Sequence, residues 1–373
     1  MIQLVHLKNF KCFRDQVFEL RPLTLLSGLN GTGKSSLLQA LILLRQSFRM
    51  GLLQSTGLAL NGDLVRLGTA HDALCGDAEE EIIDFEVVLE EGTQGQWRFD
   101  YDQKADVMNI AVGPGSSEIF KSSLFNDNFH YLEAERTGPR TSFQMSDFHV
   151  RQHRQLGTRG EYTEHFLSVF GSEDIHHRLL AHPSTESLKL RDQVEAWMGL
   201  VSPGTRIHID SHPGMDLVSL LYSFETRTQV SNRFRCTNVG FGITYTLPVI
   251  VALLASTPGS LLLFENPEAH LHPMGQVQIG ELVALAAACG IQVVVETHSD
   301  HVLNGIRLGV YNGKIEQDKV QLHFFERVEQ EEQSQISIIS PKIDRNGRID
   351  RWPDGFFDVW DKSLEALLEP KEG

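Results

Sequence analysis

The chain has 373 residues, 41% of them hydrophobic and 22% charged, which is typical of a globular protein with one large domain or one domain and an insertion. Its formal net charge of −16 argues against a surface that coats nucleic acid indiscriminately, although a local basic groove is compatible with it. The four cysteines have no C-x-x-C spacing, which fits a reducing compartment and argues against a zinc ribbon or a disulfide framework. The longest apolar stretch is cut by a Thr-Pro-Gly-Ser turn, so we expect a cytoplasmic protein without a membrane span.

Strands and helices alternate along most of the sequence. In chain order we expect strands at 2–7, 17–20 and 23–28, a helix from about 34, a loop-like segment at 49–78, a hairpin at 81–101 with Gly92 and Gly95 at its turn, and a strand that begins at 129 and breaks at 138–139. These are followed by a helix within 187–201, strands at 206–211 and 217–224, a helix at 243–255, a strand at 261–264, a helix after 273 and a strand within 291–300. This alternation indicates an α/β sheet.

A polar, histidine-rich stretch interrupts the pattern in the middle of the chain. We therefore predict an inserted lobe at 141–205. The flanking parts, 1–140 and 206–373, are expected to form one head together.

The stretch GLNGTGKS, Gly28–Ser35, matches the phosphate-loop pattern G-x-x-x-x-G-K-[ST] in full, with a strand predicted before it and a helix after it. Its glycines let successive backbone N–H groups turn toward phosphate oxygens, and the positive end of the following helix favours the same anion. Lys34 is expected to reach the β- and γ-phosphates, and the Ser35 hydroxyl to ligate Mg²⁺. The residues predicted to bind ATP here are Asn30, Gly31, Thr32, Gly33, Lys34, Ser35 and Ser36.

Further motifs occur in a fixed order around this loop. They are NFKCF (9–13), NVGFG (238–242) at the start of a helix, LLLFENPEAHLHP (261–273), and VVVETHSD (293–300). As an ordered set they resemble the ATP-binding-cassette type of ATPase, as in the heads of SMC and RecF proteins and the ATPase half of the overcoming-lysogenization-defect family. The resemblance covers about 1–45 and 235–310. It implies a P-loop NTPase fold with a mixed sheet flanked by helices and, here, a small helical lobe in place of a long coiled coil.

Two more motifs, AERTGPR (134–140) and WPDGFFD (352–358), make the chain look closest to a compact bacterial subgroup. Several proteins that resemble this subgroup serve as the ATPase of phage-defence operons such as Septu, beside a separate nuclease. The resemblance implies an antiviral role with a nuclease as the partner effector.

The same resemblance implies a composite active site, in which two protomers face head to tail. ATP would lie between the phosphate loop of one copy and Asn238, Gly240 and Gly242 of the other. The N-terminus of a helix that begins at glycines exposes backbone N–H groups and can by itself bind an anion. The alternative for this stretch is an ordinary loop before a core helix.

The acids that follow the apolar run at 261–264 depart from the pattern of these ATPases. Glu265 occupies the Walker B position and is predicted to hold Mg²⁺ through a water. Asn266 occupies the position of the glutamate that orients the attacking water, and an amide cannot take up a proton. If the chain is extended here, Glu268 projects to the same side as Asn266 and could supply the carboxylate, unless its role is structural. Glu296 is the second candidate, and we expect slow hydrolysis.

Histidines raise two further questions. His298 is expected to contact the γ-phosphate, the alternative being a hydrogen-bonded histidine at a strand end. His270 and His272, and His298 with Asp300 and His301, also invite a transition-metal hypothesis. Such a site needs three or four converging ligands, and the cassette motifs already explain each group, so Mg²⁺ is the metal that we predict.

Arginines near the middle of the chain are candidates for contacts with anions. Arg136 and Arg140 could meet phosphate or the facing protomer, or form surface ion pairs. Arg151, Arg154 and Arg159 could contact DNA, RNA or an acidic partner, or belong to a solvated loop.

The sequence thus predicts an Mg-ATP-binding ATPase that forms a homodimer or a higher oligomer and regulates a partner nuclease. One alternative is a DNA repair or recombination ATPase whose hydrolysis is stimulated by DNA. Another is a scaffold held together by ATP without phosphate release. Nothing in the sequence indicates a nuclease centre or docking to a membrane transporter.

Overall fold

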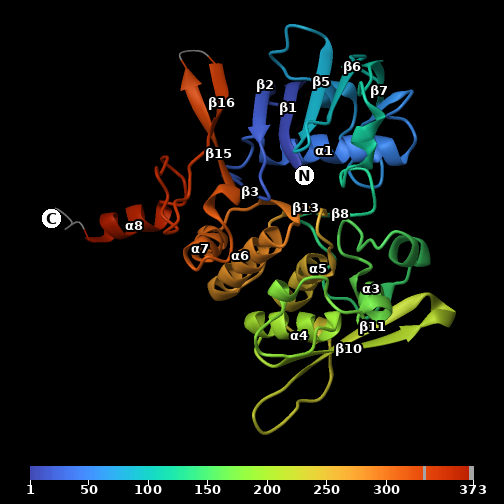
Figure 1. Ribbon diagram of the computed structural model, residues 1–373, viewed down its shortest axis with the longest axis vertical. Coiled ribbons are helices and arrows are strands. Elements are labelled where there is room, and N and C mark those ends of the chain that lie inside the picture. Colours follow the sequence, from blue (N-terminus) through green and yellow to red (C-terminus); the bar gives the residue numbers. More distant parts are fainter. Residues whose placement is uncertain (331–332, 369–373) are drawn as a thin grey trace.

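The computed structural model describes residues 1–330 and 333–368, which form an α/β structure built on three sheets (Figure 1). The strands are β1 (Ile2–Phe10), β2 (Phe13–Glu19), β3 (Leu23–Gly28), β4 (Gly57–Ala59), β5 (Ile82–Leu89), β6 (Gln94–Asp100), β7 (Val107–Val112), β8 (Phe129–Leu132), β9 (Phe143–Gln144), β10 (Thr205–His212), β11 (Leu217–Phe224), β12 (Phe234–Arg235), β13 (Leu261–Glu265), β14 (Gln292–Glu296), β15 (Val320–Gln330) and β16 (Gln333–Ile339). The α-helices are α1 (Lys34–Arg49), α2 (Ala70–Ala73), α3 (Thr163–Phe170), α4 (Leu190–Val201), α5 (Phe241–Ala255), α6 (Pro273–Ala288), α7 (Asp300–Tyr311) and α8 (Val359–Leu368).

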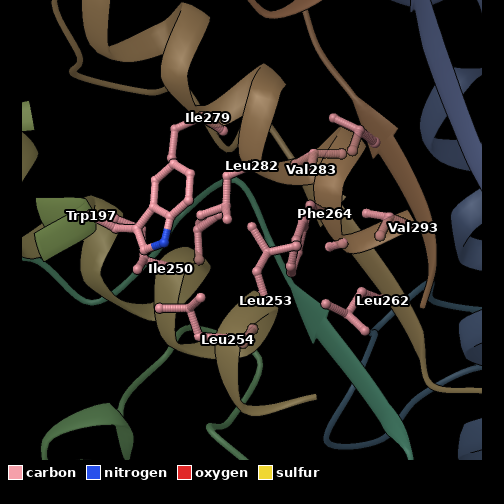
Figure 2. Packing of buried hydrophobic residues seen from close by; sticks show 14 of the residues in the cluster. Trp197, Ile250, Leu253, Leu254, Leu262, Phe264, Ile279, Leu282, Val283 and Val293 are labelled. Carbon is pink, nitrogen blue, oxygen red and sulfur yellow. The ribbon is translucent and has the colours of Figure 1, made fainter. Parts of the chain in front are cut away.

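The central sheet has the order β16-β15-β3-β14-β13-β8, with β15, β3, β14, β13 and β8 parallel and β16 antiparallel to β15. The strands β3, β13 and β14 at its centre are almost continuously apolar, as expected for parallel strands that are buried on both faces. Leu25 and Phe264 face a core shared with α5 and α6, whereas Leu26 and Leu263 face a core shared with α1 and the N-terminal sheet. Figure 2 shows Leu253 of α5 packed against Phe264 in the first core.

The N-terminal sheet is antiparallel, with the order β2-β1-β5-β6-β7-β4. The predicted hairpin lies here, but Gly95 is inside β6 and pairs with Val87, so its placement at the turn was wrong. The turn closes earlier, where Leu89 donates its N–H to the Thr93 carbonyl. Gly95 is instead covered by Trp97, whose ring would lie 2.5 Å from an added Cβ.

The third sheet belongs to the lobe at the bottom of Figure 1 and consists of β9, β10, β11 and β12. Because β9 pairs with β11, this sheet draws strands from both sides of residue 205. Helix α4 packs on α5, and Trp197 lies beside Ile250 in Figure 2. The division at 141 and 205 stays a prediction.

The C-terminal motif 352–358 packs against the head. Phe356 is buried, with its ring 5.3 Å from that of Phe324 and 5.4 Å from that of Trp352. Arg307 of α7 donates to the Gly347 carbonyl and lies over the Trp352 ring. Among the helices described, none is both long enough and apolar enough to cross a bilayer.

One buried acid makes the stability of the lobe depend on pH. Glu164 of α3 is 3% exposed, and burial raises its pKa to about 8. An acid whose pKa is higher in the folded state stabilises the fold at low pH and loses that contribution as the pH rises. We expect Glu164 to lower the free energy of unfolding by about 1.4 kcal/mol per pH unit between about pH 5 and pH 8.

Urea unfolding of wild type and Glu164→Gln at several pH values measures this effect. The variant should lose less stability than wild type as the pH rises, and the exposed Glu186→Gln should behave like wild type. Parallel pH profiles for wild type and Glu164→Gln would contradict the prediction.

Candidate functional site

The phosphate loop is already curled around its own lysine. Lys34 is buried, and its Nζ donates to the Gly28 carbonyl at 3.0 Å and the Leu29 carbonyl at 2.7 Å. Gly28 has φ +137°, and an added Cβ would lie 2.1 Å from the Phe325 carbonyl oxygen of β15, so glycine is required where β3 ends. Asn30 and Gly31 are exposed at the mouth of the loop. The loop thus has the shape of an anion cradle.

Helix α1 begins directly after this loop. Within the described part of the chain no side chain caps its first turn, and Gly33 at the N-cap is left-handed with φ +94°. The first N–H groups of a helix have no partner within the helix and carry partial positive charge. Thr32 is buried, and Ser36 donates its backbone N–H to the Gly33 carbonyl, which closes the turn. The backbone N–H groups at the start of α1 can donate hydrogen bonds to phosphate oxygens.

Two glutamates end neighbouring parallel strands beside the loop. Glu265 of β13 and Glu296 of β14 are paired in register. The Ser35 hydroxyl donates to Glu296 Oε1 at 3.1 Å. Burial and repulsion from Glu265 raise the pKa of Glu296 to about 7, although the Ser35 hydrogen bond opposes the shift. The acid in contact with Ser35 is therefore Glu296 and not Glu265.

Glu265 is held from the other side. Its Oε1 accepts a hydrogen bond from the Tyr131 hydroxyl at 2.9 Å, and its Oε2 one from the Ala134 backbone N–H at 3.3 Å. Tyr131 was missed by the sequence reasoning, since only the pairing of β8 with β13 shows that it faces an acid. Both carboxylate oxygens of Glu265 thus have protein donors.

Arg136 fastens the chain that follows β13. Its guanidinium donates to the carbonyls of Glu265 at 2.9 Å, Asn266 at 2.7 Å and Tyr245 at 3.0 Å. It is only 2% exposed and bonds to backbone carbonyls, so the expectation of a surface ion pair was wrong, whereas a contact with phosphate or the facing protomer stays a prediction. Arg140 of the same motif is exposed.

The chain from Asn266 to Leu271 is a turn. Asn266 is left-handed with φ +44°, and Ala269 donates its N–H to the Asn266 carbonyl. The expected extended path was wrong, because asparagine tolerates this conformation and lets the chain reverse. Glu268 is nevertheless buried at the site, where its Oε1 accepts from Thr297 Oγ1 at 2.7 Å and from the His298 N–H at 3.3 Å. Burial raises the pKa of Glu268.

Three buried acceptor oxygens in this region have no hydrogen-bond partner among the residues described. They are Asn266 Oδ1, Glu268 Oε2 and Glu296 Oε2. Buried polar atoms are nearly always paired, so unpaired ones indicate a place for water, an ion or a ligand donor. Carboxylate and amide oxygens are suitable ligands for Mg²⁺ and for its coordinated waters. The residues present therefore fit an Mg-nucleotide.

Two cavities adjoin the phosphate loop. One, of about 430 Å³, is lined by Gly31, the NFKCF motif and Arg327. The other, of about 890 Å³, lies between Leu29 of the loop, His298 at the start of α7, and Phe357 of the C-terminal motif. His298 is exposed on this side.

The NVGFG turn lies elsewhere on the protomer. Asn238, Gly240 and Gly242 line a separate cavity of about 460 Å³ together with His270 and His272. An added Cβ on Gly242 would lie 2.5 Å from the His270 carbonyl oxygen, whereas one on Gly240 would meet nothing within 4 Å. One copy of the chain thus does not bring this turn to its own phosphate loop.

The histidine pairs have structural partners. His270 packs against the rings of Phe241 and Tyr245, and His272 caps α6 by accepting from the Met274 N–H. In the described ranges no group of three or more His, Cys, Asp or Glu side chains could hold a metal ion.

The three lobe arginines are all matched by acids. Arg151 pairs with Asp147 at 2.8 Å, Arg154 with Glu173 at 3.0 Å, and Arg159 with Glu135 at 2.5 Å. Their charges are largely balanced within the chain.

Comparison with known proteins agrees with this geometry. Residues 1–121 match the AAA ATPase domain family, and residues 172–304 match the family described as AAA domain, putative AbiEii toxin, Type IV TA system. Residues 315–367 match a family described as a protein of unknown function, DUF3696. No curated protein sequence matches the chain.

Among solved structures, the SMC head domain from Pyrococcus furiosus, with an extended coiled coil and bound to the C-terminal domain of ScpA, is similar over 99% of each chain, with a TM-score of 0.50 and 12% identity. An SMC head domain from Thermotoga maritima aligns over 91% of this chain and 98% of its own, with a TM-score of 0.46 and 12% identity. This chain has an SMC-head-like P-loop NTPase fold. No long coiled coil is present in the part of the chain that the structure describes. The fold and the domain matches together support a nucleotide-binding ATPase.

The hydrogen bonds of Arg136 give a test of the site's framework. Arg136→Lys keeps the charge but cannot reach the same carbonyls, so we expect the free energy of unfolding to fall by about 1–3 kcal/mol. Urea unfolding measures this, with the exposed Arg140→Lys as a control that should change it by less than about 0.5 kcal/mol. Equal stability of the two variants would show that the Arg136 contacts do not hold this turn.

Proposed function

We propose that the protein binds Mg-ATP at the phosphate loop, closes around it with a second copy of itself, and hydrolyses it slowly. The observation that carries this proposal is the preformed cradle around Lys34, backed by three buried oxygens of this site that have no partner among the described residues. A cradle built by backbone N–H groups and a helix start selects phosphate groups.

Residues 30–36 would hold the phosphates. The Lys34 ammonium would exchange its hydrogen bonds to two loop carbonyls for contacts with the β- and γ-phosphates. Ser35, Glu265 and Glu296 would hold Mg²⁺, which supplies charge neutralisation of the phosphates. The contact between Ser35 and Glu296 supports Glu296 as the acid nearest the ion. Glu265, fixed by Tyr131, would act through a water.

Glu268 is our candidate for the carboxylate that activates the attacking water. One of its oxygens is fixed by Thr297 and the His298 N–H, and the other is buried and free of donors within the described residues. Asn266, whose Oδ1 is likewise unpaired there, would position the water. The amide of Asn266 cannot itself take up a proton, which supports slow turnover.

A second copy would complete the site. Asn238, Gly240 and Gly242 line a cavity apart from their own phosphate loop, which supports a role for them on the neighbour's nucleotide. His298, exposed beside Leu29, would contact the γ-phosphate. ATP binding and closure would then be the main working event.

We further propose that closure regulates a separate effector, such as a nuclease, in bacterial antiviral defence. The support is the match of residues 172–304 to a domain family described with a toxin system, together with the motifs 134–140 and 352–358. No active centre for cleavage of nucleic acid stands out in the sequence, so cleavage would belong to the partner.

Lys34→Ala tests nucleotide binding. We expect the affinity for a fluorescent ATP analogue with Mg²⁺ to fall at least about tenfold, because the phosphate charge loses its cation. Lys314→Ala, which removes a lysine that follows α7 and pairs with Glu281 of α6, is the control and should bind like wild type. Undiminished binding by Lys34→Ala would sink the proposal.

Glu268→Gln and Glu296→Gln separate the two acids. We expect Glu268→Gln to bind Mg-ATP normally but to release phosphate at least about a hundredfold more slowly, since the base is removed. Glu296→Gln should weaken the dependence of binding on Mg²⁺ instead. If Glu268→Gln hydrolyses like wild type, the substitute-carboxylate role is wrong, and an absence of phosphate release from wild type would favour the ATP-held scaffold.

Gly240→Asp tests the second copy. An added Cβ at Gly240 meets nothing within 4 Å, so the variant should fold, but its charge would repel a triphosphate. We expect ATP binding by the monomer to persist and the ATP-dependent dimer to be lost, as measured by light scattering in the Glu268→Gln background. Gly214→Asp, at an equally open glycine on the lobe hairpin, is the control.

A further inference from the structure

A basic segment follows β11 in the lobe. The ten residues 226–235, TRTQVSNRFR, hold Arg227, Arg233 and Arg235 and no acid, in a chain whose net charge is −16. The three arginines are exposed, and the segment ends in β12, which pairs with β11. Positive charge is thus concentrated on one short surface segment.

These arginines differ from the other basic groups of the lobe. Within residues 1–330 and 333–368 none of the three guanidinium groups makes a hydrogen bond or an ion pair, although the backbone of Arg235 pairs with Leu221 of β11. The nearest acid in the sequence, Glu225, is already taken by Arg206 at 2.8 Å. Unpaired guanidinium groups at this density repel one another, and an anionic ligand would relieve that repulsion.

In the sequence an aromatic residue, Phe234, stands between Arg233 and Arg235. Phe234 is 39% exposed, and its ring lies beside that of Phe224, with 6.3 Å between the two ring centroids. Val230 on the same segment is 63% exposed. Arginines that contact phosphates and an exposed ring on which bases stack form the combination that binds single-stranded nucleic acid.

The segment leads directly into the NVGFG turn. The 3-10 helix η5 (Cys236–Asn238) follows β12, and Cys236 Sγ donates to the carbonyl of Arg140, an exposed arginine. Phe234 and Gly240 line the same cavity. A ligand bound to the segment would therefore lie next to the turn.

We propose that residues 226–235 bind single-stranded nucleic acid, with Arg227, Arg233 and Arg235 on the phosphodiester backbone and Phe234 stacked on a base. Because the segment adjoins the NVGFG turn, binding of a nucleic-acid strand to it would be coupled to ATP-dependent closure. This link rests on the proposed function, whereas the binding itself does not.

The chain offers a matched control for the experiment. Arg227→Ala/Arg233→Ala/Arg235→Ala removes three unpaired arginines, and Arg151→Ala/Arg154→Ala/Arg159→Ala removes three that are paired with acids. Both variants lose the same formal charge. Fluorescence anisotropy with a labelled 20-nucleotide oligothymidylate, the matching duplex and oligouridylate, over a series of salt concentrations, reports the affinity and its salt dependence.

We expect the first triple variant to bind oligothymidylate at least about tenfold more weakly, with a log–log salt slope shallower by roughly 2. The paired-arginine variant should retain most of the wild-type affinity. Phe234→Ala alone should weaken binding roughly tenfold without changing the salt slope. Stronger binding of oligouridylate than of oligothymidylate would identify RNA as the source of the strand and still support the proposal.

Equal losses in the two triple variants would overturn the proposal, as would binding of the duplex alone or no binding to any oligonucleotide. Competition by polyglutamate as effective as that by unlabelled oligonucleotide would assign the segment to an acidic protein partner instead. Lys34→Ala should keep its affinity for the oligonucleotide. If it does while wild type fails to bind ATP, the proposed function fails and the nucleic-acid site stands.

Discussion

The arrangement of the site depends on the parallel register of three neighbouring strands. β14 lies between β3, which carries the phosphate loop, and β13, so Glu296 is placed between Ser35 and Glu265. Parallel strands present their carboxyl ends at the same edge of a sheet, where ligands of α/β proteins bind. A slip by one residue would move each side chain to the other face of its strand, and Glu296 would no longer lie beside both Ser35 and Glu265.

This arrangement gathers acidic side chains in a buried part of the site, and burying their negative charges costs free energy. Burial raises the pKa values of Glu268 and Glu296, which shows that their charged forms are disfavoured. Thr297 and Ser35 each donate one hydrogen bond, and one oxygen of each carboxylate is left without a donor among the described residues. Such strain is typical of a site that is completed by its ligand.

The lobe shows how charge in a sequence differs from charge on a surface. Arg151, Arg154 and Arg159 look like the arginines of 226–235 as sequence, but among the described residues only the first group is paired with acids. Paired surface charges contribute little to stability or to binding. Unpaired ones remain available for an anion.

The sequence by itself determined the phosphate loop and most strands of the central sheet, because these depend on local spacing and on apolar runs of the right period. The SMC-head-like class followed from the resemblance of its ordered motifs to those of known ATPases. The sequence did not determine the turn at Asn266, the burial of Arg136 or the contact of Ser35 with Glu296. Those features join residues more than a hundred positions apart, or depend on a backbone conformation that asparagine tolerates without requiring. Only the tertiary structure decided them, since side-chain partners are set by how strands and helices pack and not by neighbours along the chain.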